Sequence, residues 1–138
     1  MKESPRRMGS GGQKSDISSL LRDFVEAVAR HGELTERSAD ADLTNREYHR
    51  YDRARQALLK ASKGRSALIG LLGHRNVWVR YVAASSCADF APRAAERALV
   101  AISQEPGIIG FNARISLRKL RGELNSNVAR HTDGDGHA

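Results

Sequence analysis

Hydrophobic side chains recur at steps of three and four residues along most of this chain, which is the spacing of amphipathic helices. Residues 15–31 predict the first helix, capped by Ser15 or Asp16 and ended by Gly32. Its apolar stripe consists of Ile17, Leu20, Leu21, Phe24, Val25 and Val28. Residues 44–62 predict a second helix, because Thr44 and Glu47 have the spacing of a capping box. Gly64 is expected to stop it.

Residues 33–43, between these two helices, are polar and rich in acidic side chains. This segment is the longest connection that the pattern predicts within the folded part. Its acidic residues, which lack apolar neighbours that would form a pocket, are Glu33, Glu36, Asp40 and Asp42. We therefore interpret the segment as a solvated loop rather than as an acid–base pair, and as a region where a partner could make contact.

The middle of the chain has two short apolar segments joined by a polar turn. Residues 67–72 predict a short helix, residues 73–76 predict the turn, and residues 77–88 predict the next helix. This last helix is apolar nearly all round at 100° per residue, which is typical of a helix buried on several sides. The sequence therefore predicts that it lies in the middle of the fold, with structural roles for Asn76, Trp78 and Arg80.

Two further helices follow. Pro92 is expected to begin the first of them, because proline is favoured at a first helical position. Pro106 and Gly107 interrupt the chain before the last helix, which is expected to run from about residue 108 to 120 or 124. The segments around residues 68–84 and 99–118 share a pattern in which Arg80 matches Arg114, 34 residues later. A helix–turn–helix unit of this length buries its apolar face by stacking on its neighbours.

The two ends of the chain differ from this pattern. Residues 1–14 are basic and rich in glycine and serine, and residues 125–138 are polar with alternating aspartate and glycine. Such segments bury too little apolar surface to fold, so both are expected to be disordered tails. The predicted folded domain comprises residues 15–124.

The stretch Val77-Trp78-Val79-Arg80-Tyr81-Val82-Ala83-Ala84, preceded by Asn76 in the turn, resembles the second helix of a HEAT-type repeat. The span from residue 68 to about 124 also resembles a small bacterial family described as a domain of unknown function, numbered two thousand and nineteen. The shared features are Leu-Leu-Gly-His, Val-Arg-Tyr-Val-Ala-Ala, Asp-Phe-Ala-Pro, Gly-Phe-Asn-Ala-Arg and a later Leu-Arg. The resemblance implies an all-α fold, a short HEAT-like superhelix of about six helices, and it implies no activity.

Composition narrows the setting of the protein. No apolar run approaches the ~20 residues of a membrane span, and the first residues lack the apolar core of a secretory signal. Cys87 is the single cysteine, so no intramolecular disulfide forms, and we expect a reducing cytoplasm. The net charge is +7, and residues 63–124 carry ten basic and four acidic side chains. An acidic protein or a nucleic acid is therefore an electrostatically plausible partner, although charge also serves solubility.

The candidate contact residues are cationic. Arg114, Arg118 and Arg121 follow one another at i, i+4 and i+7, with Lys119 beside them and Arg75 in a turn. These five residues predict a surface for phosphates or an acidic protein, or alternatively a solvated helix face. Arg80 and Arg114 also fit a structural role, in which a guanidinium binds a carboxylate or a turn carbonyl of a neighbouring repeat.

Patterns that would indicate an enzyme are weak. Cys87 lies in the most apolar helix and is expected to be a buried hydrophobic residue, and the five histidines form no metal-binding motif. The glycine-rich segment before Lys14 lacks the phosphate-loop spacing. We therefore predict no catalysis, cofactor or metal. The first hypothesis is a module that binds another protein, and the alternative is a nucleic-acid binder that uses the basic second half and N-terminal tail.

Overall fold

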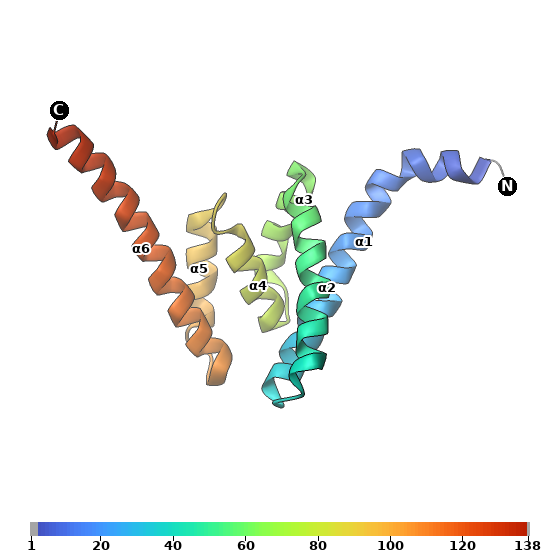
Figure 1. The fold of residues 1–138 in the computed structure, drawn as a ribbon, viewed down its shortest axis with the longest axis horizontal. Coiled ribbons are helices and arrows are strands. Elements are labelled where there is room, and N and C mark those ends of the chain that lie inside the picture. The colour runs from blue at the N-terminus through green and yellow to red at the C-terminus, as the bar shows by residue number, and fades with distance from the viewer. Residues whose placement is uncertain (1–2, 138) are drawn as a thin grey trace.

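The computed structural model describes residues 3–137, with side chains described for residues 16–122. Every element over residues 3–137 is helical, which confirms the predicted all-α fold of six helices (Figure 1). The elements are α1 Glu3–Glu36, α2 Ala41–Leu59, α3 Ser62–Gly70, the 3₁₀ turn η1 Leu71–Gly73, α4 Val77–Cys87, α5 Pro92–Ile102 and α6 Gly107–His137. Helices α1 and α6 form opposite edges of the molecule (Figure 1).

Helix α1 ends later than the sequence predicts, because Gly32 does not terminate it. Gly32 lies inside the helix and lets it approach Trp78 closely: a Cβ added there would lie 2.2 Å from Trp78 Cγ. The helix ends at Glu36, where Ser38 adopts a left-handed φ of +53°. The N–H of Ala39 donates to the Leu34 carbonyl and that of Ser38 to the Thr35 carbonyl, the pattern of a Schellman cap. The predicted loop over 33–43 is thus only four residues long, from 37 to 40.

The capping box expected at Thr44 is also absent. Helix α2 begins three residues earlier, at Ala41, and the Thr44 hydroxyl donates to the Ala41 carbonyl inside the first turn. Gly64, expected to stop this helix, is buried inside α3, where an added Cβ would lie 2.0 Å from the Leu58 carbonyl oxygen. Both glycines therefore serve close approach of two segments, and neither ends a helix.

Helix α4 lies in the middle of the fold, as its apolar pattern predicts. It packs against α1 on one side and α6 on the other, and also contacts α3 and α5. Asn76 caps it, because the Asn76 side chain accepts from the N–H groups of Trp78 and Val79 at 2.9 and 3.1 Å. On the α1 side, Trp78 Nε1 donates to Glu36 at 2.8 Å, and on the α6 side, the Tyr81 hydroxyl lies 2.9 Å from that of Ser116.

One hydrophobic core extends from α1 to α6. Phe24 of α1 meets Tyr51 of α2 edge to face, while α4, α5 and α6 contribute aliphatic side chains. Pro92 occupies the start of α5 as predicted, and Gly107, with a φ of +79°, turns the chain into α6. The inner face of α6 buries Ile109, Ala113, Leu117 and Leu120.

The ends of the chain continue the two edge helices. Helix α1 already begins at Glu3, and α6 runs on to His137, beyond the predicted limit near residue 124. Helices α1 and α6 therefore extend over most of residues 1–14 and 125–138, for which the sequence predicts disorder. The domain limits of 15–124 stay a prediction, since the side chains of residues 1–15 and 123–138 lie outside the described ones.

Candidate protein-binding face

The two repeat-matched arginines make the same kind of contact. Arg80 Nη1 donates to the carbonyls of His74 and Arg75 at 2.8 and 3.2 Å, in the turn before its own helix. Arg114 Nη1 donates to the Ser103 carbonyl at 2.9 Å, in the turn before α6. Each guanidinium therefore binds the turn that precedes its own helix, whereas the sequence predicts a contact with a neighbouring repeat.

The predicted cationic set is not a single free surface. Arg114 donates one hydrogen bond to the carbonyl of Ser103, and Arg121 Nε donates to Glu96 of α5 at 2.8 Å. Both side chains are nevertheless exposed. Arg118 and Lys119 are exposed on α6 and pair with no acidic side chain among residues 16–122. Arg75 is exposed in the turn before α4, and no hydrogen bond or ion pair within the described part connects its side chain to α6.

The outer face of α6 carries a feature that the sequence did not reveal. Ile108, Phe111 and Ile115 are 47%, 53% and 39% exposed. Their spacing of i, i+3 and i+7 places them in one row. At 100° per residue this row lies on the opposite side of the helix from Ile109, Ala113 and Leu117. We call these three residues the α6 outer stripe.

Sequence reasoning missed the α6 outer stripe because it singled out only the cationic residues of this helix and did not separate its apolar residues by face. A helix that is apolar on two opposite sides reads in sequence like any buried helix. Only its position at the edge of the molecule shows that one side has no covering helix among the described residues (Figure 1). The signal that could have found it is the run Ile108-Ile109, which puts large apolar side chains on both faces.

Positive charge borders the α6 outer stripe on both sides. On a helical wheel Arg118 lies about 20° beyond Phe111, and Lys119 lies about 20° beyond Ile108 on the other edge. Residues 107–122 contain four basic side chains and no acidic one: Arg114, Arg118, Lys119 and Arg121. The face is therefore an apolar row between two cations.

The acidic connection proposed as a second contact region is engaged within the fold. Glu36 accepts the Trp78 indole N–H, and Glu33 pairs with Arg30 at 3.1 Å. Asp40 and Asp42 are exposed at the start of α2, where a negative charge stabilises the helix by interacting with the positive end of its dipole. Within residues 33–43, Leu43 is the one exposed large apolar side chain.

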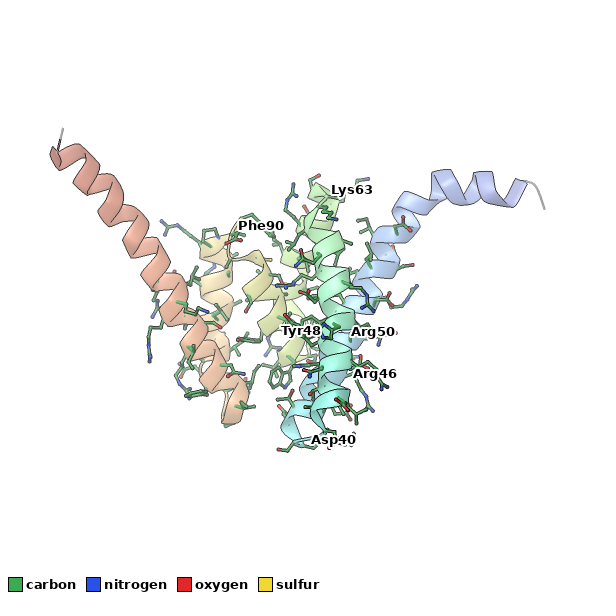
Figure 2. The ribbon with its side chains drawn as sticks, in the orientation of Figure 1. Asp40, Arg46, Tyr48, Arg50, Lys63 and Phe90 are labelled. Atoms are coloured by element: carbon green, nitrogen blue, oxygen red, sulfur yellow. The ribbon has the colours of Figure 1, made fainter. Side chains whose placement is uncertain are left out.

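The α1–α2 hairpin holds a cluster of ionisable and aromatic side chains. Figure 2 shows Tyr48 and Arg50 along α2, with Arg46 and Asp40 nearer its start. Arg50 bridges to α1 through Glu26 at 3.0 Å and Asp23 at 3.7 Å. His31 packs against the rings of Tyr48 and Tyr51. Desolvation lowers the pKa of His31, against an opposing effect of Glu47, and burial raises the pKa of Tyr51 to about 12. These contacts join two helices.

The remaining candidate chemistry is structural. Cys87 is fully buried, as predicted, and burial raises the pKa of its thiol to about 11, which opposes thiolate formation at neutral pH. Among the side chains of residues 16–122, no group of three or more histidine, cysteine, aspartate or glutamate residues could hold a metal ion. None of the helices, within the part of the chain that was searched, is long and apolar enough to cross a membrane.

Comparisons of the chain with models of protein families, with curated proteins and with solved structures find no match. The resemblance to HEAT-type repeats is neither supported nor contradicted by them. Among the described side chains, the α6 outer stripe is the one row of three exposed large apolar residues on a single helix face.

Proposed function

We propose that this protein is a non-enzymatic, HEAT-like helical module that binds another protein through the outer face of α6. The observation that carries the proposal is the α6 outer stripe. Exposed apolar side chains are common singly, but a row of three large ones on one helix is the usual sign of an interaction surface.

The side of the molecule opposite α6, formed by α1 and α2, supports the same conclusion (Figure 1). A stack of helical pairs stays soluble when its last helices present polar outer faces. Helix α2, which packs only on α1 and α3 among the stronger contacts, follows this rule. Its exposed side chains include Asn45, Arg46, His49 and Arg53, and its two exposed large apolar ones, Leu43 and Tyr48, lie about 140° apart on the helix and form no row. Helix α6 departs from it, and a partner that covers α6 would complete the missing layer.

Nucleic-acid binding is the weaker candidate for this face. A phosphate-binding surface needs several cations that are free to contact the backbone. Arg114 and Arg121 are partly engaged within the chain, and the apolar row separates Arg118 from Lys119. The buried, single Cys87 fits the cytoplasmic location that the sequence predicts, where thiols stay reduced.

A face-specific binding comparison tests the proposal. The full-length tagged chain is recovered from nuclease-treated cells, alongside an Ile115→Asp variant and an Ile69→Asp control. Ile69 of α3 is an ideal match, since both isoleucines are 39% exposed. We expect the Ile115→Asp variant alone to lose its bound proteins, while all three chains keep the same melting temperature because neither side chain belongs to the core.

Equal recovery of the same proteins by all three chains would contradict the proposal. So would a bound fraction that disappears with nuclease treatment, because this result would favour the nucleic-acid alternative.

A further inference from the structure

We infer that the partner covers α6 with an amphipathic helix of its own, whose apolar row is flanked by aspartate or glutamate on both sides. This inference rests on the proposed function and deepens it, since it names the chemistry of the partner. It follows from the shape of the α6 outer stripe and from the charges that border it.

The geometry favours a helix as the occupant. Ile108 and Ile115 are seven positions apart, or about 10 Å of helix axis at 1.5 Å per residue. The row i, i+3, i+7 is the pattern by which one helix docks on another, with ridges of side chains fitting into grooves. A partner helix with three apolar anchors over two turns would bury Phe111, the most exposed of the three, at the middle of the contact.

The charges define the flanks of that partner helix. Arg118 and Lys119 border the stripe on opposite edges, so a helix lying along it meets a cation on each side. Acidic residues next to the apolar anchors would pair with both cations, whereas lysine or arginine there would be repelled. The rim charges thus select for an acidic partner, while the apolar row supplies most of the binding energy.

A second copy of this chain fits the same face poorly. Packing α6 on another α6 would bring four basic residues against four more, with no acidic residue in residues 107–122 to relieve them. The other exposed large apolar side chains of the described part are scattered over three helices: Leu43, Tyr48, Ile69 and Val100. No second apolar row with acidic flanks is available among these residues, which favours a different protein as the occupant.

Three synthetic helical peptides test the inference against the full-length chain. One has an apolar row of leucines flanked by glutamate, the second has the same row flanked by lysine, and the third is a scrambled form of the first. We expect the glutamate-flanked peptide to bind at least tenfold more tightly than either of the others in fluorescence anisotropy. Its affinity should weaken with salt, because the flanking pairs are exposed.

Variants of the face give the matched controls. Phe111→Ser should weaken binding of the glutamate-flanked peptide by about tenfold or more, since the contact would lose its largest and most exposed apolar side chain. The double variant Arg118→Glu with Lys119→Glu should reverse the order of the glutamate- and lysine-flanked peptides. Ile69→Ser, on α3, should change neither affinity.

Equal binding of the glutamate- and lysine-flanked peptides, binding of the scrambled peptide, or no binding at all would overturn the inference. Sedimentation that shows a dimer broken by Phe111→Ser would assign the face to a second copy and overturn it as well. Tighter binding of a double-stranded DNA fragment, lost in the double variant, would do the same. If these peptides fail while Ile115→Asp still loses its cellular partners, the proposed function stands and only the partner's chemistry is wrong.

Discussion

Replacement of Gly32 by alanine should destabilise the protein, although the residue lies inside a helix. Alanine is the better helix former, and in an open helical position the change stabilises by up to about 1 kcal/mol. At position 32, however, the new Cβ would lie 2.2, 2.4 and 2.7 Å from Trp78 Cγ, Cδ1 and Cδ2. All three distances are shorter than van der Waals contact allows, so α1 or the indole must move.

The indole has little freedom to move. Trp78 is only 7% exposed, its N–H donates to Glu36 at 2.8 Å, and its ring meets Tyr81 edge to face. Overpacking of this kind costs about 1–3 kcal/mol. Three contacts under 3 Å put this clash at the upper end of that range, about 2–3 kcal/mol, so after subtraction of about 1 kcal/mol of helix propensity we expect Gly32→Ala to lower the free energy of unfolding by about 1–2 kcal/mol. For a domain of this size that corresponds to a melting temperature lower by roughly 4–8 °C.

Urea unfolding followed by circular dichroism measures this effect. The control is Gly122→Ala on α6, where nothing lies within 4 Å of the added Cβ, and which should be neutral or stabilising. A double-mutant cycle isolates the clash, because Gly32→Ala should become harmless in a Trp78→Leu background. A Gly32→Ala protein as stable as the parent, or a cycle without coupling, would refute the close approach of α1 and α4.

Substitutions at four further positions test other parts of the fold. Asn76→Ala should cost about 1 kcal/mol in urea unfolding, because two N–H groups lose their cap, while Asn76→Asp should retain the stability. Ser38→Gly should add about 0.5–1 kcal/mol, since glycine tolerates the φ of +53° without strain, and an unchanged midpoint would argue against the Schellman cap. Arg80→Leu should lower stability by about 1 kcal/mol by removing the hydrogen bonds to the turn before α4, and unaltered melting would exclude that role. Burial lowers the pKa of His31 in the folded state below the ordinary value of 6.5, so the unfolded chain binds the proton more readily. The free energy of unfolding should therefore fall as the pH drops below about 6.5. His31→Gln should reduce this loss in melting curves recorded from about pH 8 to about pH 5.

The sequence was sufficient for the fold class and for the central helix. Helical periodicity and the proline at position 92 are local signals, and each depends only on neighbouring residues. The helix limits around residues 32–44 were wrong for a different reason. Gly32 is required by Trp78, which lies 46 residues away in the chain, and a single sequence does not reveal such a long-range contact.

The candidate site was predicted only in part. Sequence spacing placed Arg114, Arg118 and Arg121 on one helix, but it could not show that two of them contact Ser103 and Glu96 of their own chain. The α6 outer stripe depends on which side of a doubly apolar helix lacks a neighbour. That property belongs to the tertiary structure, because the helical period alone does not show which of two apolar faces packs against the core.

The central claim is that the outer face of α6 is covered by a partner protein. The most direct measurement places a photo-reactive amino acid at position 115 or, as the matched control, at position 69, and illuminates intact cells. We predict discrete protein adducts from position 115 that resist nuclease and diminish when Phe111 is changed to serine. Absence of adducts at position 115, or the same adducts from both positions, would contradict the claim.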